Sequence, residues 1–208
     1  MLLSSPPLLA FCDLSFERND RLLFEQVDGA IHGGDILQVV GANGVGKTTL
    51  LRILATLLTP TQGELRWRGG LLPGARARYL AELAFLGHGP GLKSGLSPRE
   101  NLRWLAGLFA QRAGIEDALA TVGLAEWLDT PCAQLSAGMQ RRVALARLAL
   151  ARARLWILDE PLTAIDRDGV TLVEQLFSNH LQSGGAIIFS SHQAVDLPGV
   201  KYLALAGS

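Results

Sequence analysis

The first part of the chain alternates short apolar runs with polar turns, a pattern typical of β-strands. Residues 8–16 and 22–31 are expected to form two strands, with the polar residues 17–20 as the turn between them. Residues 36–40 form a third apolar run, which leads directly into a glycine-rich loop. After this loop, apolar residues recur at helical spacing over residues 47–58. The beginning of the chain therefore predicts strands followed by one helix.

The middle of the chain has a helical pattern instead, beginning near residue 97. Ser97-Pro98-Arg99-Glu100 combines an N-cap residue, a first-turn proline and an acidic residue three positions after the cap. This combination is a capping box, so a helix is expected to begin there. Two further helices are expected, at residues 115–122 and 136–151.

Strands are expected on both sides of this helical block. Short apolar strands are expected over residues 81–86, 155–158 and 186–190, and a helix over residues 166–182. Strand–helix–strand units on both sides of a helical block predict an α/β fold with a parallel core sheet and a helical insertion near residues 90–150.

Composition narrows the class of protein. The chain has 208 residues, of which 49% are apolar and 18% charged, with 19 basic and 19 acidic residues. This apolar content supports a large core, and the balanced charge gives no reason to expect nucleic acid as a partner. Mean hydropathy is high at +0.25, yet no unbroken apolar run reaches the roughly 18 residues that span a bilayer. We therefore expect one domain that buries surface against another molecule.

The glycine-rich loop carries the clearest chemical motif. Residues 41–48 match G-x-x-x-x-G-K-[ST] and lie between a predicted strand and a predicted helix. Successive backbone N–H groups and the helix start would face phosphates, Lys47 would contact the β and γ phosphates, and Thr48 would offer a hydroxyl to Mg²⁺. The expected nucleotide-binding residues are Gly41, Ala42, Asn43, Gly44, Val45, Gly46, Lys47, Thr48 and Thr49.

Two carboxylates follow a buried apolar strand about 110 residues later. Asp159 ends this strand and is the second candidate Mg²⁺ ligand, through a water molecule. Glu160 comes next and is the candidate general base for an attacking water. Taken alone, such a pair is more often a helix cap or a solvated turn, and only the phosphate loop makes the catalytic interpretation the better one.

Three smaller features accompany these motifs. Ser136-Ala137-Gly138 begins a predicted helix and forms a second candidate anion site, although an ordinary N-cap explains it equally well in isolation. Asp166 lies in a short turn after the carboxylate pair. His192 follows the last core strand, where an imidazole could contact the γ phosphate, although a single histidine at a strand end is usually structural.

Together and in this order, the five motifs resemble the nucleotide-binding subunits of ABC transporters. The resemblance covers residues 8–205 and implies a P-loop NTPase (RecA-like) core sheet with an antiparallel β edge and an inserted ABC helical subdomain. It implies a single ATP-binding domain, with its core at about 1–90 and 152–208 and its helical subdomain at about 91–151. It also implies a homodimer, in which ATP lies between the phosphate loop of one copy and Ser136–Gly138 of the other, with Asp166 near the same site.

A narrower resemblance is to the haem exporter ATPases of cytochrome c maturation. It is carried by residues 85–93, 135–148 and 155–166. It implies integral membrane subunits of the CcmB and CcmC type as partners and a peripheral location on the cytoplasmic face of the bacterial inner membrane. Haem would be handled by those partners, since the sequence shows no haem-ligand motif. Either haem export or release of a haem-loaded chaperone is compatible with the sequence.

Several positions depart from the superfamily pattern, among them Ala137 and Met139 in the second candidate anion site and Ile165 before Asp166. His88 stands where a glutamine normally contacts Mg²⁺ and the attacking water, and we expect it to couple the nucleotide state to the membrane partner. Its alternative is a strand-end histidine without a role. The residue that stacks on adenine stays open among Phe16, Glu17 and Arg18.

Other functions remain as alternatives. Another ABC exporter, for a drug or small solute, would carry the same motifs and differ in its membrane partner. A soluble ABC-type scaffold ATPase is the second alternative, and a protein without any membrane fraction would favour it. For a transporter subunit, a docking groove around residues 86–110 would explain the high apolar content.

Overall fold

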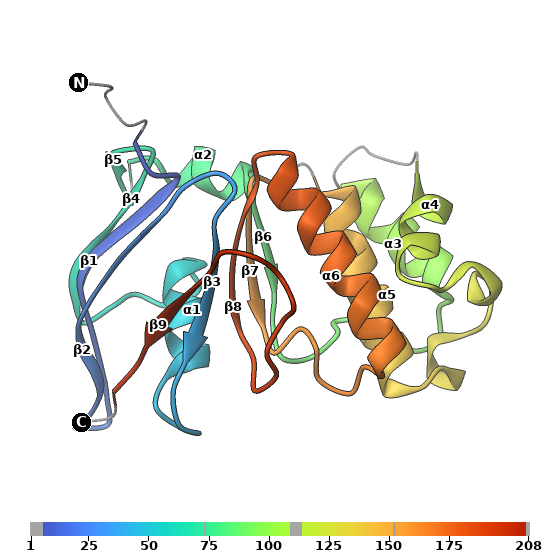
Figure 1. Ribbon diagram of the computed structural model, residues 1–208, viewed down its shortest axis with the longest axis horizontal. Coiled ribbons are helices and arrows are strands. Elements are labelled where there is room, and N and C mark those ends of the chain that lie inside the picture. The colour runs from blue at the N-terminus through green and yellow to red at the C-terminus, as the bar shows by residue number, and fades with distance from the viewer. Residues whose placement is uncertain (1–5, 73, 109–113, 152, 207–208) are drawn as a thin grey trace.

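The computed structural model describes residues 6–72, 74–108, 114–151 and 153–206. A parallel sheet forms the centre of the molecule and has the strand order β6-β7-β8-β3-β9 (Figure 1). Its strands are β3 (Ile36–Val40), β6 (Leu83–Leu86), β7 (Leu155–Asp159), β8 (Ala186–Ser190) and β9 (Val200–Ala204). The predicted parallel core is therefore confirmed, and β6 begins two residues later than expected because helix α2 ends at Ala81.

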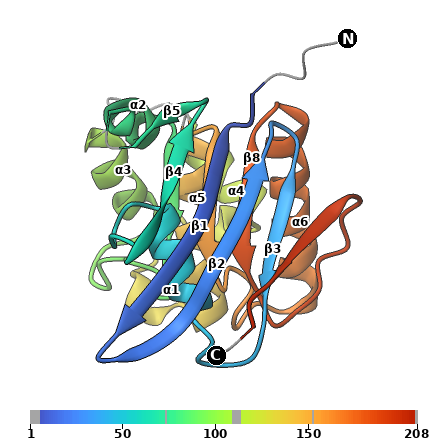
Figure 2. The same cartoon turned by 90° about the vertical axis from the view of Figure 1, so that its left-hand side faces the viewer.

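The antiparallel strands form a second sheet rather than an edge of the core sheet, as Figure 2 shows from its outer side. This sheet has the order β2-β1-β4-β5 and consists of β1 (Leu9–Arg18), β2 (Arg21–Ile31), β4 (Gln62–Trp67) and β5 (Gly70–Leu71). Asn19 and Asp20 alone connect β1 to β2, and their φ angles of 51° and 57° suit a tight hairpin. The turn is thus two residues long rather than four.

The described residues contain six α-helices. They are α1 (Lys47–Leu54), α2 (Arg76–Ala81), α3 (Pro98–Leu108), α4 (Ile115–Thr121), α5 (Ala137–Leu150) and α6 (Arg167–Gln182). The capping box at α3 is confirmed, since the Ser97 N–H donates to Glu100 Oε2 at 2.8 Å and the Glu100 N–H donates to Ser97 Oγ at 3.3 Å. No helix of the described residues is both long and apolar enough to cross a membrane.

Helix α1 is shorter than its apolar pattern predicts. Thr56 has a left-handed φ of 57°, and its N–H and that of Leu57 donate to the carbonyls of Ile53 and Arg52. This arrangement is a Schellman motif, which ends a helix. The prediction that α1 extends to Leu58 is therefore wrong.

Both faces of the parallel sheet are buried, each by a different layer. Leu155 and Ile157 of β7 join a core formed with α1 and the antiparallel sheet. Trp156 and Leu158, which point the opposite way, join a core formed with α5 and α6. This packing fixes the carboxyl ends of β3, β7 and β8 at one edge of the sheet, where ligands bind in open parallel sheets.

Candidate functional site

The phosphate loop connects β3 to α1 at this edge. Gly46 immediately precedes the helix with a φ of 109°, and a Cβ there would lie 2.9 Å from the Phe24 ring. Glycine thus allows the loop to rest on β2 while the unpaired N–H groups of the first turn of α1 face outward. The loop and the first turn of α1 together contain the nine residues of the predicted phosphate-binding motif, of which Val45 and Lys47 are buried.

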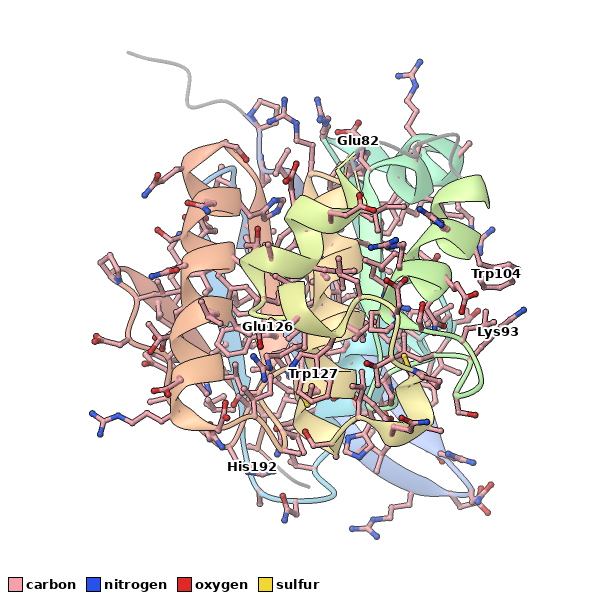
Figure 3. The ribbon with its side chains drawn as sticks, turned by 90° about the vertical axis from the view of Figure 1, so that its right-hand side faces the viewer. Glu82, Lys93, Trp104, Glu126, Trp127 and His192 are labelled. Carbon is pink, nitrogen blue, oxygen red and sulfur yellow. The ribbon has the colours of Figure 1, made fainter. Side chains whose placement is uncertain are left out.

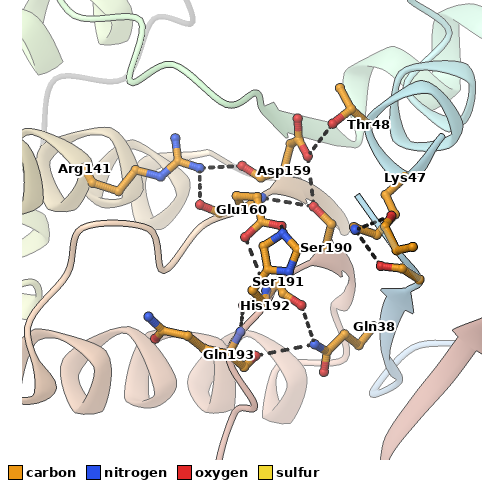
Figure 4. Close-up of polar contacts among 12 residues, drawn as sticks. Gln38, Lys47, Thr48, Arg141, Asp159, Glu160, Ser190, Ser191, His192 and Gln193 are labelled. Atoms are coloured by element: carbon orange, nitrogen blue, oxygen red, sulfur yellow. Dashed lines mark hydrogen bonds and ion pairs between the residues drawn. The ribbon is translucent and has the colours of Figure 1, made fainter. Parts of the chain in front are cut away.

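Two side chains at the start of α1 point toward the site. Lys47 Nζ donates to the carbonyl oxygens of Gly41 at 2.8 Å and Ala42 at 3.2 Å. Thr48 Oγ1 donates to Asp159 Oδ1 at 3.1 Å (Figure 4). The structure therefore brings together the two residues predicted as Mg²⁺ ligands, although 111 residues separate them in the sequence.

Asp159 is almost completely buried, with 1% of its surface exposed. Its Oδ1 atom also accepts a hydrogen bond from Ser190 Oγ at 2.9 Å, so α1, β7 and β8 converge on one carboxylate oxygen. This contact of Ser190 was not predicted from the sequence. Two hydroxyl donors that hold one carboxylate oxygen fix the orientation of the Asp159 side chain.

Glu160 lies beside His192. The distance from Glu160 Oε1 to His192 Nε2 is 3.4 Å, and the His192 N–H donates to Oε2 at 3.4 Å. The Glu160 backbone has a φ of 51°, a conformation that costs a non-glycine residue roughly 1–2 kcal/mol. Its N–H donates to Ser190 Oγ at 3.1 Å, which helps to hold this conformation.

Buried Gln38 supports the segment that contains His192. From the middle of β3, its Nε2 donates to the carbonyls of Ser191 at 3.0 Å and Gln193 at 3.4 Å. The sequence analysis missed Gln38, although one polar residue in the run Ile-Leu-Gln-Val-Val was a usable signal. The buried amide N–H groups of Gln38 need hydrogen-bond acceptors, which the loop carbonyls provide, whereas its Oε1 has no partner within the described residues.

The Ser136–Gly138 segment begins α5 at some distance along the chain from the phosphate loop. Ser136 Oγ accepts from the Met139 N–H at 3.2 Å and caps the helix. This is the ordinary N-cap role that the sequence analysis gave as the alternative to an anion site. A Cβ at Gly138 would lie 2.3 Å from the Ala164 carbonyl oxygen, so Gly138 lets the turn before α6 approach the helix start. Asp166 in that turn caps α6 by accepting from the Gly169 N–H at 2.9 Å. Within the described residues, no hydrogen bond joins Ser136–Gly138 to the phosphate loop of the same chain.

Arg141, one turn further along α5, contacts the site through backbone carbonyls. Its guanidinium donates to the carbonyls of Asp159 and Glu160 on one side (Figure 4). On the other side it donates to the carbonyls of Gly87 and His88. Burial lowers the pKa of Arg141 to about 10, so it remains charged at neutral pH. The sequence analysis assigned this residue no role, although an arginine aligned with the buried Leu145 and Leu148 was a signal.

The His88 side chain is exposed, and its carbonyl accepts from Arg141 Nη1 at 3.0 Å. The loop then continues toward α3, where buried Asn101 donates to the carbonyls of Lys93, Leu96 and Ser97. Lys93 Nζ lies 4.1 Å from the ring centre of Trp104, whose surface is 49% exposed (Figure 3). An exposed cation and indole therefore lie within the segment predicted as a docking groove.

The three adenine candidates lie at the end of β1. The Phe16 ring stacks on Phe24 with 6.4 Å between ring centres, and Phe24 in turn lies under Gly46. Arg18 is exposed beside the hairpin turn, and the Glu17 N–H donates to Thr61 Oγ1 at 3.0 Å.

Comparison with known proteins agrees with this architecture. The model of the ABC transporter family matches residues 24–163. The cytochrome c biogenesis ATP-binding export protein CcmA of Methylococcus capsulatus is 50% identical over 95% of this chain and 96% of its own length, and CcmA of Vibrio cholerae is 49% identical over 95% and 98%. A putative ABC transporter ATP-binding protein from Pyrococcus furiosus superimposes with a TM-score of 0.82 at 30% identity and covers 95% of this chain and 96% of its own. The chain therefore belongs to the ABC transporter family of ATP-hydrolysing subunits, in the group of CcmA-type ATP-binding proteins.

Proposed function

We propose that this chain hydrolyses Mg²⁺-ATP to drive a membrane complex that serves haem export or chaperone release in cytochrome c biogenesis. The observation that carries the proposal is the junction of Thr48 with Asp159 beside the Glu160–His192 pair, at the carboxyl ends of three parallel strands. The printed name shared by the CcmA relatives supports cytochrome c biogenesis over another exported solute.

ATP would bind with its phosphates over the loop from Gly41 to Thr49. Lys47 would exchange its two carbonyl partners for phosphate oxygens, since an ammonium–phosphate contact is a charge-assisted hydrogen bond. The hydroxyl oxygen of Thr48 and a carboxylate oxygen of Asp159 lie 3.1 Å apart. Two neighbouring oxygen ligands fit the ligand preference of Mg²⁺. When bound, Mg²⁺ would neutralise charge on the β and γ phosphates.

Glu160 would act as the general base that accepts a proton from the attacking water. His192 would hold this carboxylate through the 3.4 Å contact and report the presence of the γ phosphate. About 60% of the His192 side chain is exposed, so its ring is accessible to nucleotide from outside.

A second copy of the chain would complete each site. Ser136–Gly138 begin a helix of 14 residues, and the positive end of such a helix stabilises phosphate. Their lack of hydrogen bonds to the phosphate loop of the same chain, within the described residues, supports use by the partner copy. Asp166 lies in the turn packed on Gly138 and would approach the same interface between the two copies.

The membrane subunits, of the CcmB and CcmC type, would dock on the loop from His88 to Ser97 and on Trp104. This loop leads from the carbonyls near Glu160 to the exposed Lys93–Trp104 pair, which supports a role for His88 in coupling. The chain would then act at the cytoplasmic face of the inner membrane, with haem held by its partners. Residues 91–151 would be the helical subdomain, and residues 1–90 and 152–208 the ATP-binding core.

The test is a Glu160→Gln variant of the chain, expressed with its membrane partners. We expect it to bind ATP with an unchanged Kd and to form a stable dimer, while the ATPase rate falls at least 100-fold. The exposed Glu126 provides the control, since Glu126→Gln should leave turnover unchanged. Turnover of Glu160→Gln within twofold of the unmodified protein would contradict the general-base assignment.

Co-purification tests the proposed pathway. Haem-handling membrane subunits should elute with the tagged chain, and His88→Ala should reduce the stimulation of ATPase activity by those subunits. Elution with an unrelated permease would assign the chain to another export process.

A further inference from the structure

A single buried side chain connects two loops of the proposed site. Arg141 extends from α5 with 4% of its surface exposed and uses all five N–H groups of its guanidinium. The acceptors are the carbonyl oxygens of Gly87 (2.9 Å), His88 (3.0 Å), Asp159 (2.5 Å), Glu160 (2.7 Å) and Pro161 (3.3 Å).

These acceptors belong to two segments far apart in the sequence. One segment leaves β6 and contains His88, and the other leaves β7 and contains Asp159 and Glu160. Nη1 binds the first segment, while Nη2 and Nε bind the second. Because a guanidinium is planar and rigid, these contacts fix the separation of the two segments.

The contact with Glu160 concerns the orientation of its carboxylate. The residue has a left-handed backbone, so its direction depends on what holds its peptide groups. Ser190 holds the N–H of Glu160, and its carbonyl accepts from Arg141 at 2.7 Å and from the Thr163 N–H at 3.3 Å. Loss of the Arg141 contact would leave this carbonyl with the longer Thr163 contact.

The position of Arg141 on α5 adds a connection to the start of that helix. Ser136, the N-cap of α5, lies five residues before Arg141 on the same rigid element. Movement of the Ser136–Gly138 segment would therefore be transmitted to the carbonyls of Glu160 and His88 through this side chain.

We infer that Arg141 is a positioning residue, which holds the Glu160 carboxylate and the His88 loop at a fixed position relative to the Ser136 end of α5. This inference rests on the proposed role of Glu160 as general base. Arg141 touches no reacting atom, so it would act on turnover while leaving nucleotide affinity intact.

The experiment compares Arg141→Lys and Arg141→Gln in the full chain, purified with its membrane subunits. Lysine keeps the charge but has three donors, and glutamine has two. We expect kcat to fall at least 10-fold in Arg141→Lys and further in Arg141→Gln, with the KM for ATP within twofold. Binding of trinitrophenyl-ATP should stay within twofold, which shows that the phosphate loop is intact.

Arg147 provides a matched control on the same helix, because among the described residues its Nη2 donates to the Phe85 carbonyl alone, at 3.4 Å. Arg147→Lys should change kcat less than twofold. The double variant Arg141→Lys/Glu160→Gln should be no slower than Glu160→Gln alone, because both changes act through one carboxylate.

The outcomes separate the two proposals. If Glu160→Gln loses turnover and Arg141→Lys retains it within twofold, the positioning role is overturned and the general base stands. If Glu160→Gln retains turnover, the general-base proposal fails by itself. Failure of both Arg141 variants to bind trinitrophenyl-ATP, or equal losses in Arg147→Lys, would overturn the positioning role in favour of a general need for these arginines in folding.

Discussion

Substitution of Gly138 by alanine tests whether this glycine has a structural role within one chain. The new Cβ would lie 2.3 Å from the Ala164 carbonyl oxygen, and Ala164 is itself held at a φ of 64°. The three atoms nearest to this Cβ are backbone atoms of Ala164 and Ile165, so the clash cannot be relieved by a side chain that moves aside. Overpacking of this kind costs about 1–3 kcal/mol, and the better helix propensity of alanine offsets at most about 1 kcal/mol.

We therefore expect a net loss of about 1–2 kcal/mol in the free energy of unfolding, without nucleotide and without a partner copy. With a urea m-value of about 2 kcal/mol/M, the unfolding midpoint should fall by about 0.5–1 M. Gly95→Ala is the matched control, because its Cβ would enter open space. A Gly138→Ala midpoint equal to that of Gly95→Ala would refute the packing role and leave only a role toward the partner's phosphates.

Three further predictions concern binding and pH. Lys47→Ala should weaken ATP binding by about 1.5–3 kcal/mol and reduce ATPase activity with it, as measured by calorimetry and phosphate release, and an unchanged Kd would contradict the phosphate contact. Phe16→Ala should raise the Kd for ATP about 3- to 10-fold, more than Glu17→Ala or Arg18→Ala, because Phe16 stacks on the ring beneath the phosphate loop. Burial lowers the pKa of His180, which stacks on Trp156 at 3.7 Å, from 6.5 to about 4. The unfolded chain then binds the extra proton first, so stability is complete above pH 6.5 and is lost as the pH falls toward 4, by about 1–2 kcal/mol at pH 5. His180→Phe should flatten this dependence in urea titrations at pH 7 and pH 5, and an equally steep loss in that variant would exclude His180 as its cause.

Much of the fold follows from local pattern. The apolar runs of β3, β7 and β8 and the capping box of α3 mark these elements without tertiary information, because each depends on neighbouring residues. The end of α1 does not follow in this way, since Leu57 continues the helical spacing but is 59% exposed. Its true end depends on the left-handed Thr56, which hydrophobic periodicity does not report.

The separate antiparallel sheet also depends on tertiary context. β1 pairs with β4 across about 50 residues, and the charged residues of β4 give it little strand character in isolation. The strand forms because Leu65 and Trp67 are buried against the core around α1. A sequence pattern describes neighbouring positions, whereas this pairing depends on a surface that exists only after folding.

The residues of the candidate site also fall into two groups, those that a sequence motif reveals and those that it does not. Lys47, Thr48, Asp159, Glu160 and His192 are the residues proposed to contact nucleotide, and side chains that bind ligands occur in motifs of fixed spacing. Gln38 and Arg141 instead bind backbone carbonyls of loops that contain those residues. Carbonyl groups are present in every residue, so no spacing rule reveals which of them a buried donor will meet.

A general physical rule nevertheless makes such residues visible before the structure is known. An arginine on the apolar stripe of α5 is stable only if its buried N–H groups find acceptors, and Arg141 satisfies this requirement with five carbonyls. An apolar substitute would fill the space but leave those carbonyls without these donors, and a buried polar group that loses its partner costs about 1–3 kcal/mol. Because two of the five carbonyls belong to Asp159 and Glu160, that cost would fall on the strand end that holds both carboxylates. A buried charge on the apolar face of α5 therefore indicates loops whose backbone conformation must be held by hydrogen bonds. The same reasoning applies to Gln38, which binds the loop that contains His192.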